Sequence, residues 1–309
     1  MLNYQPDCAH TTRDVFATDI RGHTYRGFDA GDGHETILFL HGWPDNQSVF
    51  RHQYDHFRRK GYRVVRFDWI GHGASDKPSA LAHYTIEALA NDLAELIARR
   101  ALGPVHCVAH DYGAVVAWHF VTHYASLLRS YSALSIGHPA AVLRHLSLTG
   151  LIKNWFLLFN PLPWAIPLYR MHRGAFFRWA MHQHPDRDHV VQTFLTEPNP
   201  FYIQVWEQAN PLGSLIRTYG LKRLRQIPRV RVPTLGLWGA RDAYAVRGQM
   251  EHSQHLVAAP WRFVPLEKLG HWLQLEAPTV VNAHLEAWIV QHGVAAAPAS
   301  GPHEATPNQ

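Results

Sequence analysis

The chain has 309 residues, which suits one medium-sized enzyme, either a single large domain or a core with an inserted subdomain. Hydrophobic residues make up 47% of it and charged residues only 17%, below the roughly 25% of an average soluble chain, so a sizeable core is predicted and wholesale disorder is excluded. The 29 Lys and Arg residues outnumber the 24 Asp and Glu residues, but no basic run is longer than residues 58–60 (RRK), and we expect no nucleic-acid partner.

Strand and helix patterns alternate through the first part of the chain. Apolar residues recur at helical spacing in residues 85–99, where Thr85 is a candidate N-cap, and a second helix is predicted at 114–124. Short apolar runs predict strands at Val15–Ile20, 23–29, Thr36–Leu40, 62–67 and 105–109, with another strand beginning at 134–136. Such alternation predicts an α/β fold with a mostly parallel sheet and helices on both faces.

The alternation stops after residue 137. Residues 138–228 are rich in aromatic residues and prolines and contain helix-like stretches but no convincing strand, which predicts a helical cap inserted into the core. Strand patterns return at residues 232–238 and 261–264, followed by a last helix at 279–291. We therefore expect four parts, which are the first core segment 1–137, the cap 138–228, the second core segment 229–292 and a disordered tail 293–309 rich in Ala, Pro and Ser.

Cysteine content and hydropathy bear on the compartment. Cys8 and Cys107 form no CxxC pair, so a disulfide framework is not expected and a reducing compartment is the default. The amino terminus lacks the basic start and apolar run of a signal peptide. The most apolar stretch, residues 151–168, is interrupted by Lys153 and three prolines, which is unlike a membrane span of about 20 apolar residues. We expect a cytoplasmic protein without a membrane span.

Histidine is unusually frequent, with 24 residues, which raises the question of a metal site or a pH sensor. No HExxH motif occurs, and pairs at helical spacing such as His119 and His123 lack a supporting carboxylate or cysteine cluster. We therefore expect neither a metal nor a cofactor. Position singles out His271 for chemistry, with His41 and His110 as its neighbours.

A nucleophile elbow is predicted at residues 109–113 (AHDYG), which follow a strand and open a helix. Ala109 and Gly113 are small, as a tight strand-to-helix turn requires, and the turn lifts Asp111 out of the sheet edge. A carboxylate in this place can attack a saturated carbon and form an ester on the enzyme. Taken alone, an aspartate that only caps the helix explains the segment equally well.

Three further segments supply partners for this aspartate. Residues 41–44 (HGWP) follow a predicted strand, so the backbone N–H groups of Trp43 and Tyr112 are candidates for an oxyanion hole. Asp242 ends a late strand and offers an acid, and His271 follows it and offers a base. An ordinary turn, a helix cap and a structural histidine account for each piece alone. Together, the oxyanion loop and a nucleophile, an acid and a histidine in this chain order favour the triad of an α/β-hydrolase.

On these motifs the chain resembles the α/β-hydrolases of the epoxide hydrolase and haloalkane dehalogenase branch, over nearly its full length to about Gly293. Residues 67–78 (FDWIGHGASDKP) are similar to a segment that both groups share. Tyr112 stands where haloalkane dehalogenases carry a halide-binding Trp and fluoroacetate dehalogenases carry Arg. The similarity to epoxide hydrolases is stronger in residues 41–44, 50–53 (FRHQ) and 270–278 (GHWLQLEAP).

The resemblance also implies an acid in the cap, because epoxide hydrolases use two cap tyrosines to protonate the epoxide oxygen. Residues 202–208 (YIQVWEQ) resemble the family's cap helix, and counting on without gaps places Tyr219 at one tyrosine position, as the proton donor. Residues 153–159 (KNWFLLF) resemble the segment with the other tyrosine, where this chain has Phe156. We expect Phe156 and Trp43 to line the substrate site. Reserve candidates for the donor are Tyr169, Tyr202 and Tyr244.

The sequence thus predicts a hydrolase in which Asp111 forms a covalent alkyl ester and His271, oriented by Asp242, activates the water that hydrolyses it. The expected reaction converts an epoxide to a diol, with a small apolar electrophile as substrate and water as co-substrate. A homodimer is an open alternative to a monomer. Two enzyme alternatives are a haloalkane dehalogenase, in which Trp43 could donate its indole N–H to a halide, and a hydrolase of β-lactones. A non-catalytic ligand receptor of the same fold is the alternative from another class, and the intact triad argues against it.

Overall fold

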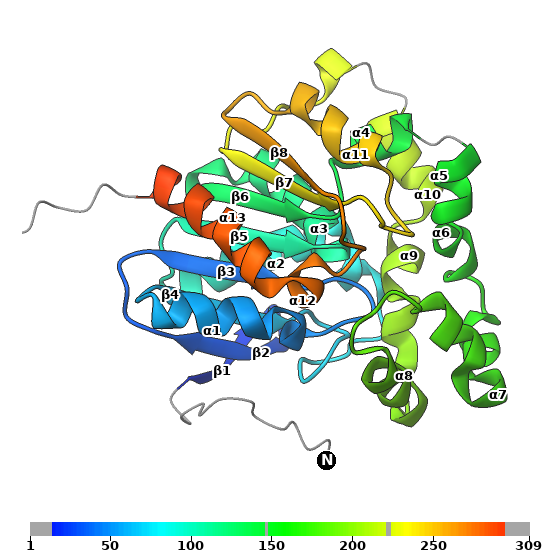
Figure 1. The fold of residues 1–309 in the computed structure, drawn as a ribbon. Coiled ribbons are helices and arrows are strands. Elements are labelled where there is room, and N and C mark those ends of the chain that lie inside the picture. Colours follow the sequence, from blue (N-terminus) through cyan, green and yellow to red (C-terminus); the bar gives the residue numbers. More distant parts are fainter. Residues whose placement is uncertain (1–13, 146–147, 221–223, 294–309) are drawn as a thin grey trace, which may run out of the picture.

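An eight-stranded sheet forms the centre of the protein, whose computed structural model describes residues 14–145, 148–220 and 224–293 (Figure 1). The strands are β1 (Val15–Ile20), β2 (His23–Ala30), β3 (Thr36–Leu40), β4 (Arg63–Asp68), β5 (Val105–His110), β6 (Leu128–Leu134), β7 (Thr234–Gly239) and β8 (Trp261–Leu266). Their order is β1-β2-β4-β3-β5-β6-β7-β8. The pairs β1–β2 and β2–β4 are antiparallel, and all later pairs are parallel. The predicted α/β fold with a mostly parallel sheet is confirmed.

One strand lies earlier than the sequence pattern predicts. The prediction that a strand begins at Leu134 is wrong, because β6 ends there and Ser135 follows with a positive φ of 71°. The strand carries Ser130 and Ser132, both buried, so its sequence lacks the unbroken apolar run of its neighbours. The Ser130 hydroxyl pairs with Nδ1 of His106 on β5 at 2.7 Å, which satisfies both polar groups inside the sheet.

Helices cover both faces of the sheet (Figure 1). Helix α1 (Arg51–Arg59) lies beside α13 (Pro278–His292) on one face, and α2 (Ile86–Arg99) packs against α3 (Tyr112–His123) on the other. The predicted N-cap of α2 is confirmed, since the Thr85 side chain accepts the backbone N–H of Ala88. The shorter helices of the core are η1 (Gln47–Phe50), η2 (Leu81–Tyr84), η3 (Ala125–Leu127), α11 (Arg247–Glu251), η7 (His252–Leu256) and α12 (Leu273–Glu276).

Between β6 and β7 the described part of the chain contains helices and no strand. We refer to residues 138–228 as the cap. The division of the chain into core and cap at these boundaries stays a prediction. The predicted tail lies outside the described residues from residue 294 on. The cap helices stand beyond the edge of the sheet at which β5 and β7 end (Figure 1). They are α4 (Pro139–Arg144), α5 (Leu148–Lys153), α6 (Phe156–Phe159), α7 (Ala165–Ala180), α8 (Arg187–Thr196), η4 (Pro200–Ile203), α9 (Val205–Ala209), α10 (Leu212–Leu215), the π-helical turn η5 (Ile216–Gly220) and η6 (Leu224–Gln226).

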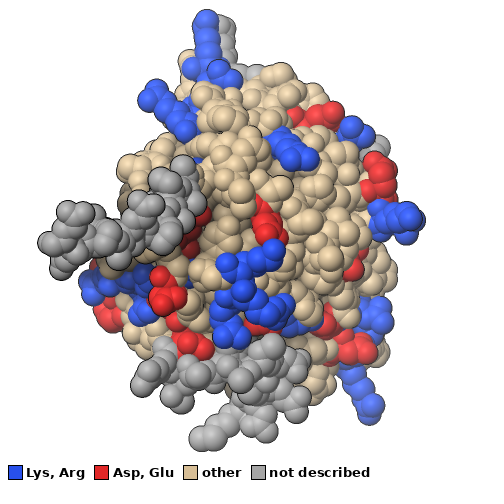
Figure 2. Space-filling model, turned by 60° about the vertical axis from the view of Figure 1, so that its left-hand side comes forward, with Lys and Arg blue, Asp and Glu red and all other residues tan. Residues whose placement is uncertain are grey.

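Charged residues make up only 17% of the chain. On the face drawn in Figure 2, Lys and Arg side chains form small groups beside Asp and Glu side chains, and large areas carry neither. Within the described ranges, no helix combines the length and the apolar character needed to cross a membrane.

Candidate active site

Asp111 lies at a sharp turn between β5 and α3, where the sequence predicts a nucleophile elbow. Its φ of 51° and ψ of −124° form a backbone conformation that costs a non-glycine residue on the order of 1–3 kcal/mol. The turn is tight, because a Cβ on Gly113 would lie 2.4 Å from the carbonyl oxygen of His41. A Cβ on Gly42 would lie 2.6 Å from Oδ1 of Asp111. These glycines therefore allow the loop after β3 to approach the turn after β5.

Two backbone amides point at the Asp111 carboxylate. The N–H of Trp43 donates to Oδ1 over 2.7 Å, and the adjacent backbone N–H of Tyr112 helps to lower the pKa of the carboxyl group. They are the two amides predicted as an oxyanion hole, and Oδ1 of the aspartate itself accepts the N–H of Trp43. Donors in this arrangement stabilise negative charge on the carboxyl group.

His271 connects Asp111 to Asp242. Its Nε2 lies 3.3 Å from Oδ2 of Asp111, and its Nδ1 lies 2.8 Å from Oδ2 of Asp242. Asp242 is fixed in turn, because its Oδ1 accepts the backbone N–H groups of Tyr244 at 2.7 Å and Ala245 at 2.9 Å. The structure brings the three predicted triad residues into one hydrogen-bonded chain.

Burial and charge together set the protonation of this chain. Burial by itself lowers the pKa of His271, but the Asp242 carboxylate and the hydrogen bond to Asp111 outweigh it and raise the pKa to about 10. Burial by itself raises the pKa of Asp111, but the hydrogen bond and charge of His271 outweigh that effect and hold this pKa below its ordinary value. At neutral pH, His271 is therefore an imidazolium between two carboxylates.

Two buried side chains hold the main chain of the histidine. Nε2 of His110 donates to the carbonyl oxygen of His271 over 3.0 Å, and the Ser135 hydroxyl donates to the same oxygen over 2.6 Å. Burial, reinforced by the positive charge of His271, lowers the pKa of His110 to about 4, so this imidazole is neutral at pH 7. His110 thus acts on the site by positioning His271 through its backbone.

Two cavities share Asp111, Tyr112 and Phe156 in their walls. The first, which we call the nucleophile cavity, is lined by Trp43, Asp111, Tyr112, Phe156, Glu207, Tyr244, His271 and Trp272. The second, which we call the apolar cavity, is lined mainly by apolar side chains, including Val115, Ile136, Pro139, Val142, Leu143, Leu157, Leu212 and Leu215. The predicted lining residues Trp43 and Phe156 lie together, with their rings 6.4 Å apart and nearly parallel.

Tyr219 is not brought to Asp111. Its hydroxyl lies 3.5 Å from Nδ1 of His119, its ring packs edge-on against His138, and it lines neither the nucleophile cavity nor the apolar cavity. Tyr219 belongs to the π-helical turn η5, whose wider winding rotates side chains away from the positions that a gapless count implies. This corrects the expectation that Tyr219 faces Asp111.

Glu207 is a candidate that the sequence analysis did not single out. It lies on α9, is 3% exposed and lines the nucleophile cavity together with Asp111 and His271. Its signal in the sequence is its place within residues 202–208, the segment that resembles the cap helix of epoxide hydrolases. A single acidic residue on a short helix is otherwise typical of a solvated face.

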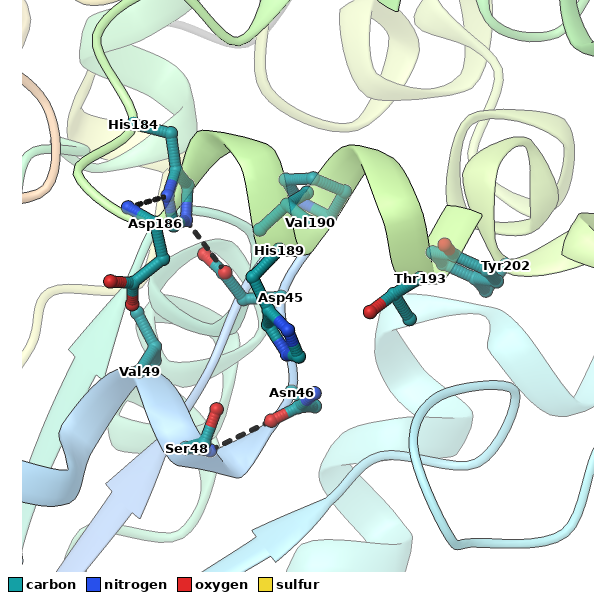
Figure 3. A pocket seen from close by; sticks show the side chains of 11 residues that line it. Asp45, Asn46, Ser48, Val49, His184, Asp186, His189, Val190, Thr193 and Tyr202 are labelled. Carbon is teal, nitrogen blue, oxygen red and sulfur yellow. Dashed lines mark hydrogen bonds and ion pairs between the residues drawn. The ribbon is translucent and has the colours of Figure 1, made fainter. Parts of the chain in front are cut away.

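A second group missed by the sequence analysis connects the cap to the core. Oδ1 of Asp45 accepts from Nε2 of His184 over 2.9 Å, and its Oδ2 accepts the indole N–H of Trp272 over 2.8 Å. Nδ1 of His184 accepts the backbone N–H of Asp186, which leaves Nε2 as the donor (Figure 3). Since Trp272 directly follows His271, the network ties the turn before α8 of the cap to the loop that carries the histidine.

Comparison with known proteins shows, independently of the geometry, which family the chain resembles. A family model described as the alpha/beta hydrolase fold matches residues 35–278. The chain is 32% identical over 260 residues to epoxide hydrolase 3 from Xenopus tropicalis, which covers 80% of this chain and 69% of that protein. It is 27% identical over 309 aligned positions to epoxide hydrolase A from Mycobacterium tuberculosis, which covers 86% of this chain and 94% of that protein.

Solved structures share the architecture. The crystal structure of an epoxide hydrolase from Bacillus megaterium in complex with an inhibitor superposes with a TM-score of 0.77 at 21% identity and covers 89% of this chain and 100% of that chain. An epoxide hydrolase from metagenomes of hot environments has a TM-score of 0.76 at 22% identity, with 89% and 98% covered. At these identities the likeness shows a common fold.

Proposed function

The chain belongs to the α/β hydrolase fold family and, within it, to the epoxide hydrolases, and from this premise we propose that it hydrolyses an epoxide to a diol through an ester on Asp111. The observation that carries the proposal is the pair of contacts at the Asp111 carboxyl group. The Trp43 amide donates to Oδ1, and Nε2 of His271 lies 3.3 Å from Oδ2. A carboxylate held in this way is suited to act as a nucleophile whose ester is then hydrolysed.

In the first step, Oδ2 of Asp111 attacks a ring carbon of the epoxide. A C–O bond of the ring breaks, and the departing oxygen must gain a proton, because an alkoxide leaves poorly. Oδ1 becomes the carbonyl oxygen of the new ester and stays within reach of the Trp43 amide. Esterification also removes the negative charge of Asp111, one of the two anions that raise the pKa of His271, so this pKa falls.

In the second step, His271 takes a proton from water, and the resulting hydroxide attacks the carboxyl carbon of Asp111. Negative charge develops on Oδ1, where the Trp43 and Tyr112 amides stabilise it. Asp242 keeps Nδ1 of His271 protonated and stabilises the imidazolium that forms. Collapse of the tetrahedral intermediate releases the diol and restores the carboxylate.

An epoxide is favoured over a haloalkane by the committed N–H groups of the cavity. The indole N–H of Trp43 donates to the carbonyl oxygen of Ile203 over 3.1 Å, and that of Trp272 donates to Asp45, so neither is free to bind a leaving halide. A second carboxyl group, Glu207, also lines the cavity. We expect diol release from styrene-type epoxides to exceed halide release from short bromoalkanes, and the reverse order would support the dehalogenase alternative.

The substrate we propose carries an apolar substituent. The apolar cavity begins at Asp111 and Tyr112 and is walled mainly by apolar side chains, an environment that binds hydrocarbon and disfavours charged groups. Epoxides with an aryl or alkyl arm are therefore expected to react faster than small polar epoxides.

Replacing the nucleophile tests the proposed function. The Asp111→Asn variant keeps the size of the side chain and removes its nucleophilic charge, so diol formation from styrene oxide should fall by at least about 10,000-fold. Asp188→Asn, which alters an aspartate whose side chain is 79% exposed, is the matched control and should react at the wild-type rate. Diol formation that survives unchanged in Asp111→Asn would refute the proposal.

A further inference from the structure

Glu207 places a second carboxyl group in the nucleophile cavity. The residue lies on α9 of the cap, and Asp111 and His271 line the same cavity from the core. Its side chain is almost fully removed from solvent, with 3% of the residue exposed. Acid–base pairs in enzymes are often built from two carboxyl groups whose surroundings differ, one ionised and one protonated.

The two oxygens of Glu207 are in different situations. Oε1 accepts the side-chain N–H of Asn160 over 2.9 Å, and Oδ1 of Asn160 accepts the Tyr169 hydroxyl over 2.8 Å, which fixes the orientation of that amide. Oε2 is buried and has no hydrogen-bond partner among the described residues. A buried carboxyl oxygen without a partner is costly in a purely structural residue. It is suited to a group whose partner is the substrate.

Burial raises the pKa of Glu207 to about 8, and the nearby Asp111 carboxylate adds to the rise. The titratable groups that face it are Asp111, His271 and Tyr244 in the shared cavity, together with the hydroxyls of Tyr112 and Tyr169. At pH 7 Glu207 is therefore a neutral acid, while Asp111, whose pKa is lowered, is ionised. The cavity thus holds a nucleophile and a proton donor at the same pH.

Other donors in the cavity are less suited to this task. The Tyr244 hydroxyl donates to the carbonyl oxygen of Ala180 over 2.5 Å. Burial raises the pKa of the Tyr112 hydroxyl well above 10, which makes it a weaker acid than Glu207. Phe156 has no hydroxyl, and Tyr219 lies elsewhere.

We propose that Glu207 is the general acid that donates its Oε2 proton to the oxygen that departs from the carbon attacked by Asp111. This rests on the proposed function. The new Asp111–carbon bond forms as the ring C–O bond breaks, and the electron pair of that bond takes up the proton from Glu207. Glu207 becomes a carboxylate and regains a proton from the His271 imidazolium, whose pKa falls once Asp111 is esterified. His271 then takes a proton from water and is an imidazolium again, so the cycle consumes one epoxide and one water and yields one diol.

The Glu207→Gln variant separates this role from a structural one. Its amide oxygen can still accept from Asn160, but the amide cannot transfer a proton. Rapid mixing of a single equivalent of styrene oxide, with the ester on the protein followed by intact mass, measures the ring-opening step. We expect ring opening at pH 7 to slow by about 100- to 10,000-fold in Glu207→Gln. Glu251→Gln, at a glutamate with a 43% exposed side chain, should match the wild type.

The pH dependence of ring opening in the wild-type protein is a second test of the role of Glu207. Ring opening needs protonated Glu207, so its rate should fall as pH rises through about 8. This fall in rate with rising pH should be absent from Glu207→Gln. An equal rate in Glu207→Gln, or a wild-type rate that stays level from pH 7 to 9.5, would overturn the proposal. If the wild type forms neither ester nor diol, the proposed function itself fails; if it opens the epoxide and Glu207→Gln does so equally fast, only the role of Glu207 fails.

Discussion

Asp111 is held by different contacts on its two carboxyl oxygens. Oδ1 accepts the Trp43 amide, whereas Oδ2 faces Nε2 of His271 at a longer distance of 3.3 Å. In the proposed mechanism, the amide-bound oxygen carries charge during ester hydrolysis, and the other oxygen attacks the substrate. The division of labour within one carboxylate therefore follows from where the backbone N–H groups point.

The many histidines of the chain take on different roles according to their surroundings. Burial lowers the pKa of His41, His72, His110 and His138, so these four are neutral packing or positioning groups. His271 is equally buried, but two carboxylates reverse the direction of its shift. Across the described residues, no group of three or more His, Cys, Asp or Glu side chains is arranged to hold a metal ion.

The Asp242 carboxylate is the strongest influence that raises the pKa of His271. In Asp242→Asn we expect turnover to fall by about 1,000- to 10,000-fold, because Nδ1 of His271 loses its anionic partner. The base form of His271 is needed for ester hydrolysis, so the hydrolysis rate rises with pH through this pKa. Since the substitution lowers the pKa, the midpoint of the rise should move to lower pH in single-turnover measurements. A midpoint that stays in place would contradict the assignment.

The structure brings together the predicted residues whose neighbours along the chain define their place. Asp111, Asp242 and His271 each follow a strand of a parallel sheet, and such positions meet at one edge of the sheet. Glu207 was missed because nothing local distinguishes a buried acid on a short cap helix from a solvated one. Its burial depends on how α9 packs over the core, which is a tertiary property.

At the scale of elements, the close approach of the loop after β3 to the start of α3 is what assembles the site. The absence of a side chain at Gly113 permits this approach, since a Cβ there would lie 2.4 Å from the carbonyl oxygen of His41. Both partners are backbone, so little can move aside, and an error in this spacing would shift the Trp43 amide away from Asp111.

We expect Gly113→Ala to lower the free energy of unfolding by about 1–3 kcal/mol because it overpacks this contact. Gly213→Ala in α10 is the matched control, since its new Cβ would meet only the side-chain tip of Arg217 at 3.7 Å. Urea unfolding measures both variants. Equal stability of the two would show that the contact at Gly113 is not tight.

The elements that the sequence misplaced are those whose local pattern is ambiguous. The serines in β6 find their partners only in the neighbouring strand, so an apolar-run criterion does not detect them. The π-helical turn η5 changes the direction of Tyr219 without changing the count of residues. Both errors come from assuming regular spacing where the tertiary structure imposes another.

At the scale of the whole molecule, two parts of the chain supply the residues of the proposed chemistry. The core supplies Asp111, Asp242, His271 and the two amides from loops at one edge of the sheet, as predicted from their order along the chain. The cap supplies Phe156 and Glu207 to the same cavity. Asp45 joins the two parts through His184 and Trp272, so the position of the cap is coupled to the loop that carries the histidine.

Trapping the ester in a His271→Ala variant tests the central claim most directly. Without the base, ring opening proceeds but hydrolysis is slowed, so the protein should gain the mass of one styrene oxide molecule, and peptide mapping should place it on Asp111. Asp111→Asn combined with His271→Ala should gain no mass. A His271→Ala protein that forms diol without accumulating an adduct, or carries the adduct on another residue, would contradict the account.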